Sequence, residues 1–398
     1  MKIRVSLSDL YVKKVLLREE LGKKLGKESI AKALNDFHAK RKPRSCGLTV
    51  HSVIGCSYAC SYCYIPDMGF SNTIPRPYGL NKEELLYALL SNPYFYPSLM
   101  GTYLAFGSIG EPFHPVGFEK TLEYMDGIAQ NLQNPIQAST KAFLKENDVK
   151  RLAIFKKYPL NILVTIITVK YFKKLESAAP TPFKRFETIE NLRNNGLYPV
   201  LFFRPVIPGI NIDEAEEIFV EAKNRGAIGV IIGGFRVSKR ILYNLKQAGF
   251  PVSEILKRAR GKVLERQVEI YTRDLKEELL KMAKNIGLTP FFSACCANTF
   301  NIMLTLGKRI PCAGLCFLNK SFCTNCPVNC ANIEVVVEEG EFARSFKRIL
   351  RIEPNEVKIE RHTIKIYLSK KRSRIFRKRV LIRVLESIYR KKIKIVHS

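Results

Sequence analysis

The chain has 398 residues, a length that suggests two or three domains. It carries 66 lysines and arginines against 36 aspartates and glutamates, a formal net charge of +30, and 46% of its residues are hydrophobic. The apolar content excludes bulk disorder, and no apolar run approaches the ~18 residues that a membrane-spanning helix needs. The N-terminal stretch, MKIRVSLSDLYVKK, has no apolar core of the kind found in secretory signals. We therefore expect a cytoplasmic globular protein with no membrane partner.

Residues 1–46 are expected to form a basic N-terminal arm, with 13 lysines and arginines against 5 acidic residues. Residues 47–250 then alternate between strand and helix patterns. Such alternation is typical of a parallel sheet with right-handed crossovers, and so predicts an α/β fold: a partial (β/α)6 barrel or a doubly wound sheet. Functional residues in both architectures lie at the C-terminal ends of the strands. The expected strands are Leu48–Ile54, Thr102–Phe106, Pro135–Ser139, Asn161–Val169, Tyr198–Phe203 and Ala227–Ile232, and the expected helices are Asn81–Ser91, Phe118–Leu132, Asn147–Lys157, 181–195 and Asp213–Arg225.

Three further regions follow the predicted barrel. Residues 251–290 are expected to be a helical extension, with a helical pattern over Val252–Gly287, and residues 291–334 a cysteine-rich metal or cluster module. Residues 335–398 are expected to form a small basic α+β C-terminal domain. Its strands are predicted at Val357–Ile359 and Thr363–Leu368, and its helix near Ile375–Arg390. From Glu341 onward, 19 lysines and arginines face 5 acidic residues.

The first group of cysteines lies in the stretch GCSYACSYCYIPDMG, where Cys56, Cys60 and Cys63 have C-x-x-x-C-x-x-C spacing directly after the first predicted strand. The chain has eleven cysteines, and an odd number argues against a disulfide framework. Three thiolates on one loop can bind three irons of a [4Fe-4S] cluster and leave the fourth iron open for chemistry, whereas electron-transfer clusters use four cysteines. The alternative is a structural zinc site in which His51 supplies the fourth ligand.

These residues resemble the radical S-adenosylmethionine (radical SAM) superfamily, and within it the branch of spore photoproduct lyase and DNA repair photolyase-like proteins. The resemblance runs from Thr49 to Arg236. Besides the three cysteines it rests on YLAFGSIGEPFHP, STKAF, VTIIT and LESAAPTPFKRFETIENLRNNGLYPVLFFRPVIPGIN. It implies a partial (β/α)6 radical SAM barrel, a [4Fe-4S] cluster, S-adenosylmethionine as cofactor, and an electron donor such as ferredoxin or flavodoxin. It also implies reductive cleavage of the cofactor to methionine and a 5′-deoxyadenosyl radical, which abstracts a hydrogen atom from a substrate.

The resemblance also implies contacts to S-adenosylmethionine. Glu111 would lie near the amino group of its methionine part and Lys141 near the carboxylate, both as charge-assisted contacts. Thr165 would be a polar contact at the end of the fourth strand, Tyr64 would pack against adenine, and Ser108 is a weaker candidate. The sequence departs from the family in one respect. Spore photoproduct lyase has a hydrogen-donating cysteine close to the segment that corresponds to 103–114, and no cysteine stands there in this chain, so repair of that lesion by that route is not expected.

The second group of cysteines has seven members between positions 295 and 330. The sequence predicts a second [4Fe-4S] cluster bound by Cys316, Cys323, Cys326 and Cys330, with Cys312 as a substitute ligand. The alternatives are a structural zinc ion or free buried thiols. The adjacent pair Cys295 and Cys296 could supply a ligand, a hydrogen donor or a redox pair, or could be two small apolar side chains.

Basic residues at both ends of the chain, with interleaved aromatic residues such as Tyr367, Phe376 and Tyr389, suit a phosphate backbone. The leading hypothesis is therefore a radical modification or repair reaction on a nucleic acid. Whether the enzyme is a lyase, an oxidoreductase or a transferase stays open. One alternative is a maturase that acts on a protein or small molecule, and another is a non-catalytic nucleic-acid-binding protein with structural metal sites. A solvated basic surface without a polynucleotide partner is the remaining alternative.

Overall fold

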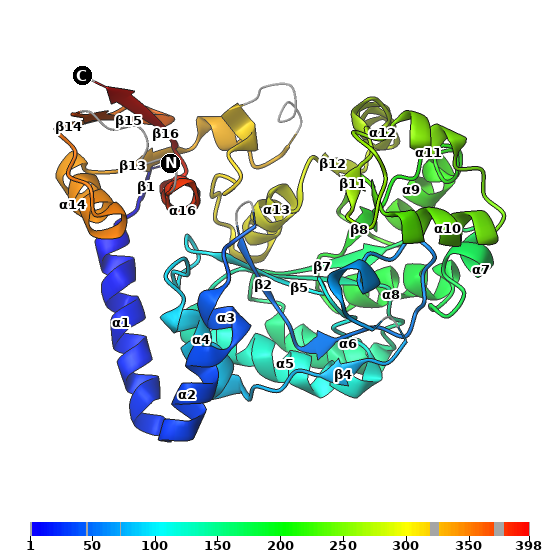
Figure 1. Ribbon diagram of the computed structural model, residues 1–398, viewed down its shortest axis with the longest axis horizontal. Helices are drawn as coiled ribbons and strands as arrows, with labels where there is room; N and C mark the ends of the chain where they lie inside the picture. Colours follow the sequence, from blue (N-terminus) through cyan, green and yellow to red (C-terminus); the bar gives the residue numbers. More distant parts are fainter. Residues whose placement is uncertain (1, 45–46, 72, 319–325, 370–377, 398) are drawn as a thin grey trace.

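A computed structural model describes residues 2–44, 47–71, 73–318, 326–369 and 378–397. Its centre is a seven-stranded parallel sheet with the order β12-β9-β8-β7-β6-β5-β2 (Figure 1). Since this order follows the chain without reversal, the sheet is a partial barrel, as one of the two predicted architectures requires, and the doubly wound alternative is wrong. The strands are β2 (Gly47–Val50), β5 (Tyr103–Phe106), β6 (Ile136–Thr140), β7 (Leu160–Thr165), β8 (Val200–Phe203), β9 (Gly229–Ile232) and β12 (Thr289–Phe291).

Helices cover the outer face of this sheet (Figure 1). Ile162 and Val164 of β7, for example, are buried in the same apolar cluster as Leu85 and Leu89 of the first outer helix. Alternate residues of a strand point to opposite faces, so Leu163 and Thr165 point to the inner face. The outer helices are α4 (Lys82–Ser91), α5 (Phe118–Gly127), α6 (Glu146–Leu152), α8 (Pro182–Asn194), α9 (Ala215–Asn224) and α12 (Arg273–Ile286).

The inner face of the sheet is covered by α13 (Ala294–Leu306), which the sequence did not predict (Figure 1). Asn161 Nδ2 donates to Asn298 Oδ1 at 2.8 Å, and Asn301 Nδ2 donates to the carbonyl of Leu160 at 3.2 Å. Residues 295–302 of this helix are all buried. Because it is enclosed on most sides, α13 has no polar face and therefore no amphipathic periodicity that a sequence pattern could reveal.

The two ends of the chain meet on one side of the barrel (Figure 1). β1 (Lys2–Arg4) pairs in parallel with β13 (Glu334–Val336), and α1 (Leu7–Lys24) contacts α4 and α14 (Glu339–Leu350). Leu7 shares an apolar cluster with Phe342, Phe346 and Tyr389. The N-terminal arm therefore packs with the C-terminal region. That region also contains α16 (Arg379–Tyr389) and a three-stranded sheet of β14 (Glu356–Ile359), β15 (Thr363–Leu368) and β16 (Lys392–His397).

The region expected to be helical over Val252–Gly287 is interrupted, so that prediction is wrong in part. α11 (Ser253–Lys257) ends before Gly261, whose φ of 137° an α-helix cannot contain, and β11 (Val268–Glu269) precedes α12. The described residues contain no helix that is both long and apolar enough to cross a membrane. The other short α-helices and strands of the described residues are α2 (Lys27–Asn35), α3 (Phe37–Lys40), β3 (Val53–Ile54), β4 (Arg76–Pro77), α7 (Phe172–Leu175), β10 (Arg236–Val237) and α10 (Lys239–Gln247).

Candidate functional site

The loop that carries Cys56, Cys60 and Cys63 follows β2 and β3 at the C-terminal edge of the sheet. Gly55 donates its backbone N–H to the carbonyl of Ile109 at 2.9 Å, which fixes the start of the loop beside the segment after β5. Ala59 has a φ of 47°, and this left-handed conformation turns the chain between the first two cysteines. Cys60 is buried, while Cys56 and Cys63 are partly exposed.

The far end of the loop is held by α10. The guanidinium of Arg240 donates to the carbonyl of Cys63 and also to Asp67 Oδ1 at 2.7 Å. Ser61 donates its backbone N–H to the carbonyl of Leu175 at 2.9 Å. The loop that carries the three cysteines is therefore held by hydrogen bonds at its start and at its far end. Such a fixed backbone positions the thiols before a metal cluster binds.

Burial governs the protonation of the three thiols. It raises the pKa of Cys56 to about 12, with the charge of Glu111 adding to the effect. It raises the pKa of Cys60 to about 11 although the ammonium of Lys141 opposes it, and it also raises the pKa of Cys63. The metal-free loop therefore carries neutral thiols at pH 7, and metal binding would release protons.

Lys141, which directly follows β6, extends a cation toward this loop. Its Nζ lies 5.4 Å from the centre of the Tyr62 ring and 3.9 Å from Glu176 Oε1, and 19% of its side chain is exposed. Burial alone would lower the pKa of Lys141, but the Glu176 carboxylate and Cys60 in its thiolate form outweigh burial and raise it. Lys141 is thus a fixed positive charge beside two of the three thiols.

A buried ion pair adjoins Lys141. Arg185 of α8 places a guanidinium nitrogen 2.6 Å from Glu176 Oε2, and both side chains are fully buried. The hydroxyl of Tyr62 donates to the other oxygen of Glu176. The sequence reasoning assigned no role to Glu176 or Arg185, although both lie in the stretch LESAAPTPFKRF that carried part of the family resemblance.

Glu111 lies on the other side of Lys141 and is 5% exposed. Its carboxylate accepts hydrogen bonds from the Thr140 hydroxyl at 2.5 Å, from the backbone N–H of Lys141 at 2.9 Å and from that of Phe113 at 3.2 Å. Burial raises the pKa of Glu111, and these three hydrogen bonds oppose the rise. The structure thus brings Glu111 and Lys141 together at the cysteine loop, through the adjacent ends of β5 and β6.

The other three predicted cofactor contacts lie at the same edge of the sheet. The Tyr64 hydroxyl donates to the carbonyl of Ser108 at 2.6 Å, and Tyr64 is 38% exposed. Thr165, the last residue of β7, is buried, and its carbonyl accepts from Arg185 at 3.1 Å.

Two cations near this edge were not singled out by the sequence reasoning. They are Arg204, which follows β8, and Lys276 of α12. Burial raises the pKa of Tyr64, and the positive charge of Arg204 opposes that rise. Burial lowers the pKa of Lys276, and the same charge lowers it further. In the sequence both cations look like ordinary surface charges, although Arg204 lies in the stretch 175–211 that carried part of the family resemblance.

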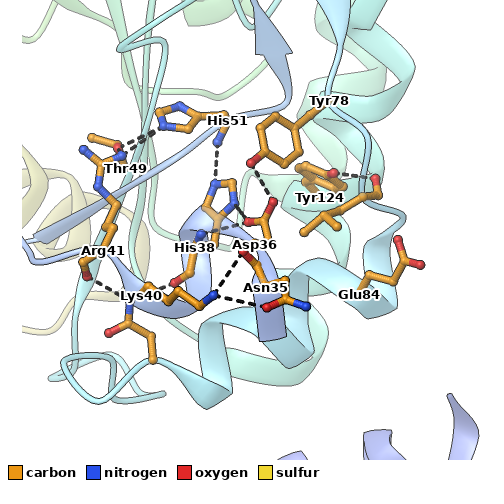
Figure 2. A network of polar contacts seen from close by, with 12 residues as sticks. Asn35, Asp36, His38, Lys40, Arg41, Thr49, His51, Tyr78, Glu84 and Tyr124 are labelled. Atoms are coloured by element: carbon orange, nitrogen blue, oxygen red, sulfur yellow. Dashed lines mark hydrogen bonds and ion pairs between the residues drawn. The ribbon is translucent and has the colours of Figure 1, made fainter. Parts of the chain in front are cut away.

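His51, the alternative zinc ligand, has other partners (Figure 2). Its Nε2 lies 2.9 Å from the Arg41 guanidinium, and its backbone N–H donates to His38 Nε2 at 3.1 Å. His38 in turn contacts Asp36 through Nδ1 at 2.7 Å, and Tyr78 donates to the same carboxylate. Burial, followed by the positive charges of His38 and Arg41, lowers the pKa of His51 to about 2. This network links the N-terminal helices to β2 and gives no support to a zinc site of His51 with the cysteine loop.

The second cysteine group differs from the predicted one. Four thiol sulfurs, those of Cys295, Cys296, Cys312 and Cys316, lie within 4.8 Å of one another. Among the described residues no other set of three or more such ligand atoms is so close, and this includes the three cysteines of the first loop. Of the predicted ligands, Cys316 and the substitute Cys312 belong to the group, Cys326 and Cys330 do not, and Cys323 lies outside the described residues. The four-ligand set predicted from spacing alone therefore stays a prediction.

Comparison with known proteins finds one family model that matches part of the chain. Residues 50–222 match the model of the Radical SAM superfamily, a span that includes the cysteine loop, Glu111, Lys141 and Thr165. An uncharacterised protein of Methanocaldococcus jannaschii is 24% identical over 183 residues, which cover 44% of this chain and 65% of that protein. An uncharacterised protein of Acidianus two-tailed virus is 22% identical over 203 residues, which cover 48% of this chain and 66% of that protein. The chain thus spans just under two thirds of the length of both relatives.

Two solved structures of spore photoproduct lyase mutants, one with bound AdoMet and dinucleoside spore photoproduct, each align with a TM-score of 0.49 at 14% identity. The alignments cover 67% and 68% of this chain and 85% and 86% of the lyase chains. A solved structure of tagged anSMEcpe with bound AdoMet aligns with a TM-score of 0.38 at 15% identity and covers 66% of this chain and 65% of that chain.

Proposed function

We propose that this chain, whose residues 50–222 match the model of the Radical SAM superfamily, is a radical SAM enzyme that modifies or repairs a nucleic acid. A [4Fe-4S] cluster on Cys56, Cys60 and Cys63 together with S-adenosylmethionine, when bound, supplies reductive cleavage to methionine and a 5′-deoxyadenosyl radical that takes a hydrogen atom from the substrate. An external one-electron donor such as ferredoxin or flavodoxin would reduce the cluster. The reaction type beyond hydrogen abstraction is left open.

The residues at the site fit both groups. Three thiols come from one fixed loop, and three cysteine thiolates can hold three irons of a cluster while the fourth iron stays open. The observation that carries the proposal is the placement of Lys141, a largely buried cation beside Cys60 and Cys63 with Glu111 next to it. A cation and a carboxylate in this arrangement suit the carboxylate and ammonium of an amino acid such as the methionine part of the cofactor.

The roles of the chain's own groups follow from this placement. Lys141 would orient the methionine carboxylate, and Glu111, held by three hydrogen bonds, would accept a hydrogen bond from the ammonium. Tyr64, with its hydroxyl fixed on Ser108, offers a partly exposed ring for adenine. Thr165 would add a polar contact at the end of β7. α13 contacts the start of β7 through Asn298 and Asn301, and would close the barrel at the end opposite the cysteine loop.

The choice of a nucleic acid as substrate rests on the charge distribution. Both basic ends of the chain lie on the same side of the barrel, joined by the pairing of β1 with β13. In the C-terminal sheet, Lys358, Lys365 and Lys394 stand opposite one another across β14, β15 and β16. Glu356 and Glu360 contact Lys358 and Lys365 at the surface and offset part of this charge. Like charges at the ~4.8 Å strand spacing destabilise a sheet unless anions offset them, so the row of lysines favours a phosphate backbone as partner.

Reductive cleavage of S-adenosylmethionine tests the enzyme class. The anaerobically reconstituted full chain, given dithionite, is expected to release 5′-deoxyadenosine and methionine even without substrate. Cys60→Ala should abolish this release. Ser61→Ala, on the same loop, removes only one hydroxyl and should retain it. Release that persists in Cys60→Ala, or that is absent from the reconstituted wild-type chain, would overturn the assignment.

A second experiment tests the substrate class separately. The active enzyme is incubated anaerobically with S-adenosylmethionine and total RNA, total DNA or a polynucleotide-free cell extract, and nucleosides and peptides are analysed by mass spectrometry. A nucleoside changed by wild-type enzyme but not by Cys60→Ala supports the proposal. Change confined to a peptide or small molecule would overturn the nucleic-acid substrate and favour a maturase. Tight polynucleotide binding without any cofactor cleavage would instead favour a non-catalytic binding protein.

A further inference from the structure

The four clustered sulfurs of the second cysteine group have the spacing of ligands around one ion. Thiolates bind zinc at about 2.3 Å in a tetrahedron, so their sulfurs stand about 3.8 Å apart. The sulfurs of Cys295, Cys296, Cys312 and Cys316 all lie within 4.8 Å of one another. The three cysteines of the first loop are not found as such a close group among the described residues.

Two segments bring these sulfurs together. Cys295 and Cys296 are in the first turn of α13, and Cys312 and Cys316 flank a tight turn in which Leu315 has a φ of 56°. This turn fits closely around the first turn of the helix. A Cβ atom added to the glycine at position 314 would lie 2.6 Å from the Cys295 sulfur and 3.5 Å from the Cys316 sulfur. Glycine is therefore required at this position for the loop to approach the helix.

Ser293 supplies an independent indication of a ligand. It occupies the N-cap position of α13, where a serine hydroxyl normally accepts a hydrogen bond from the helix backbone, yet its side chain makes no such cap. Its Oγ lies instead 3.0 Å from the sulfur of Cys295, 3.4 Å from that of Cys296 and 3.7 Å from that of Cys316. A hydroxyl within hydrogen-bond distance of three sulfurs can donate to them once they are metal-bound thiolates, as outer-shell partners of metal ligands do.

The surroundings also suit a negatively charged metal site. Four thiolates around one Zn²⁺ carry a net charge of −2. Cys295 and Cys296 lie in the first turn of α13, where the positive end of the helix dipole favours negative charge. The Lys276 side chain, whose Nζ donates to the carbonyl of Phe292 at 2.7 Å, is within electrostatic reach of Cys296 and Cys316.

We propose that Cys295, Cys296, Cys312 and Cys316 bind one structural zinc ion. With four protein thiolates the ion has no open position, so it serves the fold and not the chemistry. It would fasten the N-terminal end of α13 to the loop 312–316, and thereby hold in place the helix that closes the inner face of the sheet.

Metal analysis of the full chain tests this proposal independently of the radical chemistry. Purified wild-type protein should contain one zinc per chain, which survives loss of the iron–sulfur cluster in air. Cys60→Ala should lose iron and keep zinc, while Cys312→Ser should lose zinc. Cys326→Ser, the matched control from the ligand set predicted by spacing, should keep it. Should Cys312→Ser fail to fold, Co²⁺-substituted wild-type protein provides a second readout, and a tetrahedral tetrathiolate absorption spectrum is expected.

Several results would overturn the proposal. They are about eight irons per chain with two cluster signals by electron paramagnetic resonance, a single iron held by these four cysteines, or a disulfide between Cys295 and Cys296 detected by mass spectrometry after alkylation. Loss of zinc from Cys326→Ser would also overturn it, because a different ligand set would then hold the ion.

Discussion

The backbone N–H of Lys141 donates a hydrogen bond to the side chain of Glu111, at 2.9 Å from Oε2. The Lys141 ammonium points elsewhere and lies 3.9 Å from Glu176 Oε1. The two side chains that we assign to opposite ends of the methionine part of the cofactor are thus held at a fixed separation. A ligand with an ammonium and a carboxylate on one carbon would meet a preformed pair of charges.

Lys141→Met should therefore weaken binding of S-adenosylmethionine to the reconstituted enzyme. A hydrogen bond to a charged group contributes about 1.5–3 kcal/mol, which corresponds to a loss of affinity of about 10- to 100-fold. Isothermal titration calorimetry measures the change. 5′-Methylthioadenosine, which lacks the amino-acid part, should bind equally to both proteins. Equal losses for both ligands would show that Lys141 acts on the fold of the pocket and not on the carboxylate.

Arg185→Met should destabilise the chain strongly. The substitution leaves Glu176 buried without its guanidinium partner, and removal of one member of a buried pair costs about 3–5 kcal/mol. Denaturation followed by circular dichroism should show a lower midpoint. The double variant Arg185→Met/Glu176→Gln, which removes the uncompensated charge, should be more stable than Arg185→Met alone. If the effects of Arg185→Met and Glu176→Gln on the free energy of unfolding simply add in the double variant, this account is wrong.

Stability should fall in mild acid because of His51. The folded protein lowers the pKa of this side chain from 6.5 to about 2, so between these values the unfolded chain binds a proton that the folded chain does not. The free energy of unfolding therefore decreases as pH falls below 6.5, by about 2 kcal/mol at pH 5 from this group alone. His51→Gln, which cannot titrate, should lose less stability than wild type between pH 7 and pH 5. Identical pH profiles of the two proteins would refute the buried neutral state of His51.

Gly110→Ala should damage the cysteine loop. A Cβ at position 110 would lie 2.5 Å from the carbonyl oxygen of Val53 and 2.7 Å from that of Gly55, and both atoms belong to the backbone. The loop would have to move away from Glu111, at a cost of about 1–3 kcal/mol. Iron content after reconstitution and release of 5′-deoxyadenosine should both decrease. Gly79→Ala is the matched control, since nothing lies within 4 Å of an added Cβ there. Equal iron content and equal release of 5′-deoxyadenosine in the two variants would show that an added Cβ at position 110 is tolerated.

The row formed by Lys358, Lys365 and Lys394 should contribute to polynucleotide binding. Replacing all three by Gln is expected to weaken binding and to reduce the slope of log K against log salt concentration by about 2 to 3, since each phosphate contact contributes about 0.7–0.9. Fluorescence anisotropy at several salt concentrations measures both quantities. A control with Gln at three lysines on helix surfaces has the same net charge and should keep the wild-type slope; these are Lys150, Lys184 and Lys281. The same reduction in both variants would show that only total charge matters.

The local part of the candidate site was predictable. Cys56, Cys60 and Cys63 lie within eight positions of one another, so their spacing alone brings them onto one loop. Glu111 and Lys141 follow predicted strands, and residues at the C-terminal ends of parallel strands meet at one edge of the sheet.

The partners of these residues were not predictable. Glu176 and Arg185 were missed because a buried ion pair looks in sequence like two ordinary surface charges. Ser293 and Gly314 were missed because only their neighbours in space give them a role.

The alternation of strands and helices determined by itself that this chain forms a parallel α/β fold, because the periodicity of each element and the short connections leave few ways to bury the apolar faces. Tertiary structure alone decided that β12 extends the sheet, that α13 covers its inner face and that both basic ends meet. It also decided which sulfurs gather in the second cysteine group. Cys295 and Cys316 stand 21 positions apart, and their approach depends on how α13 packs against β7, which no spacing between cysteines encodes.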